Sequence, residues 1–210
     1  MHMAWRASID EELLTMPRKF LTPDDILSEC QYAKVRDQRR AALRPLRAIR
    51  RVPVGPFAVF VFENWETMWF QVQEMLRVEK GGDQQLVDEL EAYNPLIPDG
   101  SELVATLMLE IEDPVQRDAE LRRLGKIENH VRLRIDDSVV VGDPESDQER
   151  TDDEGRASAV HFFHFRLSQK QIAAFRGTDT KVSLEIAHPN YDYSAVVSSQ
   201  VRFELEKDLN

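Results

Sequence analysis

Histidine and carboxylate side chains that could take part in chemistry gather in two strand-like segments. Residues 127–135 and 158–167 both alternate apolar with polar side chains, which is typical of half-buried strands. Glu128 and His130 lie on the polar face of the first segment, and His164 lies on the polar face of the second. Imidazole and carboxylate groups are ligands that suit iron, manganese or zinc. The pattern therefore predicts one patch, which is either a set of surface histidines with titratable neighbours or a metal site.

His161 lies on the opposite, apolar face of its strand and is therefore expected to be buried. A buried imidazole needs at least one hydrogen-bond partner. The helix predicted over 63–80 carries polar groups that could reach the ring, namely Glu63, Gln71 and Glu74. Two interpretations stay open: a core histidine with satisfied hydrogen bonds, or a small polar pocket that binds a ligand or a metal.

The elements that must position these groups follow from the periodicity of apolar residues. From residue 101 onward the predicted order is strand, helix, strand, strand, helix, strand. This β-α-β-β-α-β order is that of the ferredoxin-like, or split βαβ, arrangement, an α+β fold. In that arrangement strand 158–167 lies between strands 102–111 and 127–135, and 181–187 is the fourth strand.

Residues 20–100 are predicted to add a helical layer to this sheet. The apolar run at 57–62 is typical of a buried strand, and the apolar residues of 63–80 repeat at helical spacing. Pro45 predicts a kink or a restart in the basic helix that precedes the strand. The predicted organisation is a flexible extension over 1–19, a mainly helical part with one strand over 20–100, and a sheet part over 101–210, the last two forming one compact domain.

Charge is unevenly distributed along the chain. The net charge of −11 argues against general nucleic-acid binding, which needs a basic surface. Residues 34–51 nevertheless carry eight basic side chains and one acidic one, and they predict an amphipathic helix that either neutralises the acidic body or docks an acidic partner protein. Residues 143–155 carry seven acidic side chains and one basic one, and they predict a solvated loop. The arginines expected to contact a partner are Arg36, Arg39, Arg40, Arg44 and Arg47.

Several classes of protein are disfavoured by what the sequence lacks. A single cysteine, Cys30, excludes an internal disulfide framework and a cysteine-based metal cluster, and it suits a reducing cytoplasm. No apolar run reaches the length of a membrane helix or of a signal-peptide core. The glycine-rich nucleotide motifs and the nucleophile-elbow motif of hydrolases are also absent. We therefore expect a cytoplasmic protein, and catalysis has no local signature.

The combination of several short motifs resembles the bacterial domain of unknown function 3501 family, over about residues 20–188. The motifs lie at 20–26, 54–56, 62–64, 71–75, 93–98, 102–106, 127–130 and 158–162. The resemblance implies a genomic context, because members of the family are companions of rubrerythrin-like di-iron proteins and iron–sulfur oxidoreductases. Polar residues within these motifs include Glu63, Gln71, Gln73, Glu74, Glu128, His130 and His161. Gln73 is therefore added to the predicted polar pocket of Glu63, Gln71, Glu74 and His161.

Three functions are compatible with these observations. The first is a non-enzymatic accessory protein of a cytoplasmic redox or peroxide-defence system, which docks an oxidoreductase partner through its basic helix. The second is a metal protein, either catalytic or not, with non-haem iron or another divalent metal, whose ligands come from Glu63, Glu74, Glu128, His130, His161 and His164. The third is a small-molecule sensor on the sheet face around Phe162 and Arg166, which also presents Thr106 and Met108. A homo-oligomer is compatible with all three.

Overall fold

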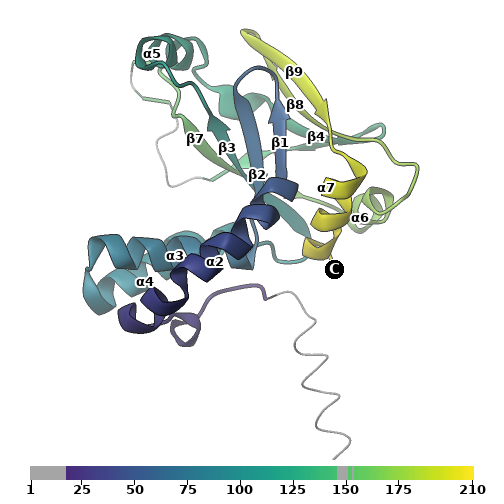
Figure 1. The fold of residues 1–210 in the computed structure, drawn as a ribbon. Helices are drawn as coiled ribbons and strands as arrows, with labels where there is room; N and C mark the ends of the chain where they lie inside the picture. The colour runs from purple at the N-terminus through teal and green to yellow at the C-terminus, as the bar shows by residue number, and fades with distance from the viewer. Residues whose placement is uncertain (1–17, 146–150, 153) are drawn as a thin grey trace, which may run out of the picture.

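The computed structural model describes residues 18–145, 151–152 and 154–210, which fold into two antiparallel sheets and a helical layer. Figure 1 shows α2, α3 and α4 together, extending beyond the sheets. The helices are α2 (Glu29–Ile49), α3 (Trp65–Glu79), α4 (Gly82–Tyr93), α5 (Pro114–Arg123), α6 (Gln169–Phe175) and α7 (Ser199–Leu205). The strands are β1 (Arg51–Val54), β2 (Ala58–Phe62), β3 (Glu102–Leu109), β4 (Val131–Ile135), β5 (Ser138–Val141), β6 (Asp143–Pro144), β7 (Val160–Arg166), β8 (Val182–His188) and β9 (Tyr191–Val196).

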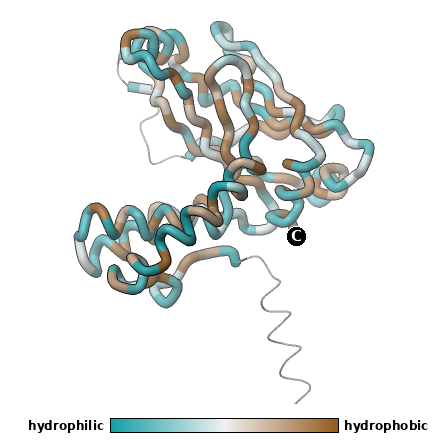
Figure 2. Tube along the Cα trace, in the orientation of Figure 1, coloured by the Kyte–Doolittle hydropathy of each residue, from teal (hydrophilic) through white to brown (hydrophobic). Residues whose placement is uncertain are grey.

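Each sheet contributes one face to a shared apolar core. The first sheet has the order β1-β2-β3-β7-β6 and the second has the order β5-β4-β8-β9. Alternate residues such as Leu107 and Phe163 from the first sheet join Leu133 and Leu184 from the second in one buried cluster. Figure 2 shows that hydrophobic residues are concentrated along these strands, whereas polar residues recur along α2. The helical layer packs against the opposite face of the first sheet. Its apolar side chains form a second cluster together with Val104 of β3.

The α+β class is confirmed, but the ferredoxin-like arrangement is wrong, because the four expected strands are divided between two sheets. Strands β3 and β7 pair with each other, whereas β4 pairs with β5 and β8. A two-residue turn at Asp136 and Asp137 returns the chain directly into β5, and Asp136 has a left-handed φ of 49°. The hairpin partner β5 occupies one edge of β4 and β8, from much later in the chain, occupies the other, so β7 cannot lie beside it.

The helical part, residues 20–100, contributes two strands to the first sheet rather than one. β1 contains Pro53, which cannot donate a backbone hydrogen bond, and it lies at the edge of the sheet, where proline is tolerated. The acidic block also differs from the predicted loop, because its first residues form β6, which pairs with β7. Residues 1–17 of the predicted extension, and 146–150 and 153 of the acidic block, lie outside the described residues.

The basic segment forms α2, a helix that runs through Pro45 without interruption, in contrast to the predicted kink or restart. Pro45 removes one backbone donor, and the carbonyl that loses its partner belongs to Ala41. Both residues are exposed, so water can hydrogen-bond that carbonyl and the helix continues. No helix in the described part of the chain is both long enough and apolar enough to cross a membrane.

Candidate functional site

A cleft of about 600 Å³ lies between the helical layer and the outer face of the first sheet, and we call it the central cleft. Its walls come from α2, α3, α4 and the start of β1, and its floor comes from β2, β3 and β7. This volume falls within the range of about 300–1,000 Å³ that is usual for small-molecule sites. The residues that line it are Arg44, Arg47, Ala48, Arg51, Val61, Glu63, Met68, Gln71, Tyr93, Thr106, Met108, Val160 and Phe162.

The floor of the central cleft is built by strand alternation and register. Thr106 pairs with Phe162 across β3 and β7, and Met108 pairs with Val160. Because neighbouring residues of a strand face opposite sides, these four side chains project away from the core between the sheets. The sequence-based prediction that Thr106, Met108 and Phe162 share one sheet face is confirmed. The result is a largely apolar floor with one hydroxyl.

Arginine side chains form a basic rim on one side of the central cleft. Arg44 is exposed and Arg47 is half-buried, and neither has an ion pair or a hydrogen bond to any described residue. Arg51 is different, because its Nη2 lies 2.6 Å from the Glu110 carboxylate, which neutralises it. Two guanidinium groups of the rim are therefore available to bind an anion.

Glu63 supplies a buried carboxylate to the same cleft, with only 6% of the residue exposed. Its Oε1 accepts a hydrogen bond from Thr106 Oγ1 at 2.5 Å, while its buried Oε2 has no hydrogen-bond partner among the described residues. Arg50 fixes the backbone at this point, because its Nη2 donates to the Glu63 carbonyl oxygen at 3.0 Å and its Nε donates to that of Phe62 at 2.9 Å. The carboxylate is thus held in place with one oxygen still lacking a donor.

Gln71 and Tyr93 form the remaining polar wall of the central cleft. Gln71 Nε2 lies 3.5 Å from the Tyr93 hydroxyl, a long and weak hydrogen bond. Burial raises the pKa of Tyr93, so its hydroxyl stays protonated at neutral pH and is both a donor and an acceptor. Both side chains can therefore turn toward a ligand at little cost.

Glu74, also predicted for the polar pocket, instead attaches α2 to α3. Its Oε1 accepts hydrogen bonds from the Tyr32 hydroxyl and from Arg36 Nε, both at 2.7 Å, and its Oε2 lies 2.7 Å from Arg36 Nη2 and 3.4 Å from Arg40 Nη2. The hydrogen bonds from Arg36 lower the pKa of Glu74 to about 2, although burial opposes this shift. Arg36 and Arg40 are therefore engaged within the protein.

We expect Glu74→Gln to lower the free energy of unfolding by about 1–2 kcal/mol at neutral pH, because it removes a charge-assisted pair that is only partly shielded from water. The folded-state pKa is depressed, so the stabilisation is present above the unfolded pKa of 4.5 and is lost as the pH falls toward about 2. Urea unfolding at several pH values measures both effects. Glu66→Gln, at an exposed position of α3, is the control, and an equal loss in the two variants would contradict the assignment.

His161 lies on the other side of the sheet from Glu63, Gln71 and Glu74, and the predicted pocket that would unite them does not form. It pairs in register with Leu107, and its ring stacks on Phe163 in the core between the two sheets. The residue is 1% exposed, and its Nε2 lies 2.9 Å from the Ser158 carbonyl oxygen. Of the predicted pocket residues, Glu63 and Gln71 share the central cleft, and Gln73 is buried elsewhere in α3.

The predicted metal ligands also lie in different places. Glu128 and His130 belong to a 3-10 turn (Ile127–His130) that precedes β4, not to a strand, and the His130 ring lies edge-on to His188 with ring centroids 5.0 Å apart. His164 lies in the first sheet, with its ring nitrogens 3.0 Å from Glu102 and 2.7 Å from Glu145. Within the described ranges, no group of three or more His, Cys, Asp or Glu side chains is arranged to hold a metal ion.

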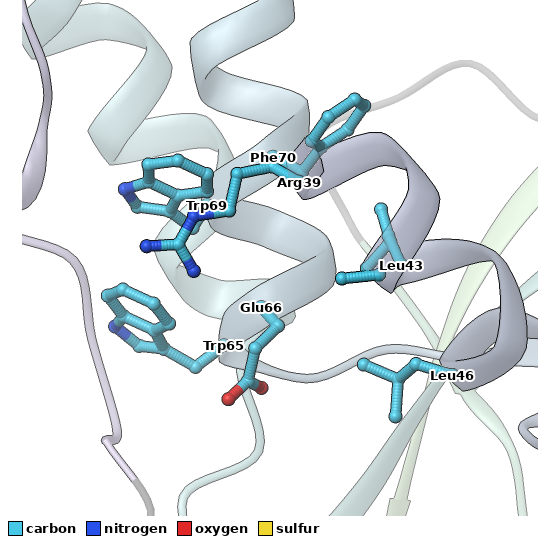
Figure 3. A pocket seen from close by; sticks show the side chains of 8 residues that line it. Arg39, Leu43, Leu46, Trp65, Glu66, Trp69 and Phe70 are labelled. Carbon is cyan, nitrogen blue, oxygen red and sulfur yellow. The ribbon is translucent and has the colours of Figure 1, made fainter. Parts of the chain in front are cut away.

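A second, smaller hollow of about 100 Å³ lies beside α2 and α3. Figure 3 shows Arg39 reaching over Trp69, whose ring stacks with that of Trp65. The indole nitrogens of Trp65 and Trp69 donate to the carbonyls of Phe20 and Asp25, so the pair also anchors the segment before α2. This hollow is too small for most organic ligands.

Comparison with known proteins places the chain in a family. The family model described as "Protein of unknown function (DUF3501)" matches residues 20–209. The chain belongs to the DUF3501 family. It is similar to a solved structure described as a novel protein of unknown function from Burkholderia pseudomallei K96243, at 39% sequence identity and a TM-score of 0.83, over 90% of this chain and 99% of that one. No curated protein matches the chain.

Sequence reasoning missed two groups that shape the cleft of this DUF3501 protein. Arg50 belongs to the basic block, and nothing in that pattern distinguishes it from its exposed neighbours, although it is fully buried. Tyr93 ends α4, and the motif at 93–98 could have drawn attention to it, but nothing local indicates that its hydroxyl faces Gln71. Both roles depend on contacts between segments that lie far apart in the sequence.

Proposed function

We propose that this protein is a non-enzymatic binding protein whose central cleft takes a small organic anion. The observation that carries the proposal is the presence of two guanidinium groups, those of Arg44 and Arg47, at the edge of a cleft of about 600 Å³, neither of them paired with any described residue. The apolar floor around Phe162 and Met108 would cover the hydrocarbon part of such a molecule. This refines the sensor hypothesis, whose other predicted residue, Arg166, is paired with Asp143 and lies outside the cleft.

The arrangement of charge and apolar surface favours an organic anion over an inorganic one. Guanidinium groups bind carboxylates and phosphates through paired hydrogen bonds, and Arg44 and Arg47 lie one helical turn apart on α2. An apolar body that covers the floor would add about 25 cal/mol for each Å² of apolar surface removed from water. An inorganic ion would leave that floor exposed to solvent.

Caproate, a carboxylate with a short aliphatic chain, is the first probe. We expect wild-type protein to bind it in isothermal titration calorimetry, and we expect Arg44→Gln and Arg47→Gln each to weaken binding by about tenfold, which corresponds to roughly 1.4 kcal/mol. Arg132→Gln, at an exposed arginine of β4, is the matched control and should leave the affinity unchanged. Absence of binding, or equal weakening by Arg132→Gln, would contradict the proposal.

Docking of an oxidoreductase partner in a redox or peroxide-defence system is a second candidate function. Its structural support is that Arg39 and Arg44 are exposed on α2 of a protein with a net charge of −11. The partner class rests on the family resemblance alone. Co-purification with the co-encoded iron–sulfur oxidoreductase or rubrerythrin-like protein at low and high ionic strength tests it, because contacts between such charges weaken as the Debye length shortens.

Metal binding stays a prediction, and the arrangement of the described residues adds no support to it. Elemental analysis of protein purified without a histidine tag is the direct test. Stoichiometric metal that is lost in His130→Ala or His161→Ala would revive the hypothesis.

A further inference from the structure

We infer that the ligand of the central cleft is a zwitterion, with its anionic group on Arg44 and Arg47 and a protonated amine on Glu63. This inference rests on the proposed function and names the chemical class of the ligand. It follows from the presence of guanidinium groups, a carboxylate and apolar side chains in the lining of one cleft.

The Glu63 carboxylate has one oxygen without a hydrogen-bond donor among the described residues. A buried polar atom without a hydrogen-bond partner is unfavourable, and a buried carboxylate oxygen is among the most costly. Thr106 satisfies only Oε1, and no described residue donates to Oε2. Because Glu63 lines the central cleft, a donor on the ligand can complete its coordination.

The surroundings of Glu63 determine which kind of donor suits this oxygen. Arg50 directs its guanidinium group to the Glu63 backbone carbonyl and to Asp208, and Arg51 is paired with Glu110, so these neighbouring cations do not neutralise the Glu63 carboxylate. A hydroxyl on the ligand would satisfy the hydrogen bond but would leave the charge. A protonated amine does both, since charge-assisted hydrogen bonds are stronger than neutral ones.

The charged groups of the cleft come from different elements. The guanidinium groups of Arg44 and Arg47 come from α2, whereas Glu63 follows β2 and contacts Thr106 on the floor. Apolar side chains such as Met68, Met108 and Phe162 also line the cleft. A molecule with an ammonium group and a carboxylate joined by a hydrocarbon chain complements all three regions, while Gln71 and Tyr93 can hydrogen-bond to either end.

The test compares ligands that differ in one group. Wild-type protein is titrated calorimetrically with aminocaproate, caproate and hexylamine, and the comparison is repeated with the shorter chains of β-alanine and γ-aminobutyrate and their matched acids. We expect the best amino acid to bind about tenfold more tightly than the matched carboxylate, and hexylamine to bind most weakly. In Glu63→Gln, which keeps the size of the side chain, amino acid and carboxylate should bind with similar affinity.

Two controls separate the outcomes. Glu112→Gln removes a carboxylate from an exposed position outside the cleft and should preserve the preference for the amino acid. Thermal unfolding without ligand verifies that Glu63→Gln is folded. If carboxylates bind through Arg44 and Arg47 but no amino acid of the series binds more tightly, the zwitterion is wrong and the proposed function stands. If no carboxylate binds, both fail.

Discussion

Replacing Arg50 by methionine is expected to lower the free energy of unfolding by about 3–5 kcal/mol, the usual cost of breaking a buried ion pair by removing one partner. Arg50 is fully buried, and its guanidinium group pairs with the carboxylate of Asp208, which is 8% exposed. The same group donates to the carbonyl oxygens of Phe62 and Glu63. The variant would leave a buried carboxylate without its cation and two carbonyls without donors.

Urea unfolding at about pH 7.5 measures this loss. Burial raises the pKa of Asp208 to about 6 although Arg50 opposes the shift, so the carboxylate is ionised at that pH and its pairing matters. Arg51→Met is the matched control, because its exposed pair with Glu110 should contribute at most about 1 kcal/mol. Adding Asp208→Asn to Arg50→Met should recover part of the loss. Equal losses in Arg50→Met and Arg51→Met would contradict the buried-pair assignment.

Arg50 also joins the fold to the candidate site. It links the last turn of α2, the end of β2 and the C-terminal segment that carries Asp208 and Glu204. Because it holds the Glu63 carbonyl, it fixes the backbone from which the Glu63 side chain enters the central cleft. We therefore also expect those Arg50→Met molecules that remain folded to show a weaker preference for a zwitterion over the matched carboxylate.

The parts of the fold that the sequence predicts are those with a local periodic signal. Helix α3 and strands β3 and β7 are predictable because their apolar residues recur at periods of 3.6 and 2. Strand β9 could not be predicted in the same way. Only Tyr191 of its residues is buried, so the strand shows no regular alternation of buried and exposed side chains. The division into two sheets could not be predicted, because it depends on pairings between residues far apart in the sequence, such as Ala58 with Leu109. The local sequence around either residue does not indicate its partner.

The same distinction applies to the candidate site. Strand alternation by itself places Thr106 and Phe162 on one face of a sheet. It misplaces His130, because residues 127–130 resemble the start of a strand but form a 3-10 turn after Lys126, whose φ is 66°. It places His161 correctly in the core, yet cannot tell which layer covers that face of the sheet. Side-chain direction is thus local information, whereas the identity of the facing layer depends on the whole fold.

His164→Gln is expected to lower the free energy of unfolding by about 2 kcal/mol near pH 6, with a smaller loss at high pH. The imidazole is 6% exposed, and its two nitrogens lie 3.0 Å from Glu102 and 2.7 Å from Glu145. The hydrogen bond to Glu102 is the main reason that the pKa of His164 is raised, against burial. Both nitrogens donate only in the protonated ring, so the imidazolium form joins β6 and β7 to the start of β3.

The sign of the pH dependence follows from the raised pKa. The stabilisation by His164 is fully present below the unfolded value of 6.5 and is lost as the pH rises through the higher folded value, so the difference between wild type and variant should shrink as the pH rises above 6.5. His188 should behave in the opposite way, because burial lowers its pKa. Its contribution to the free energy of unfolding is therefore lost as the pH falls. Urea unfolding of His164→Gln and His188→Gln, measured both below and above pH 6.5, should therefore give differences from wild type that change with pH in opposite directions. A difference for His164→Gln that does not change with pH would mean that a neutral imidazole packs between Glu102 and Glu145.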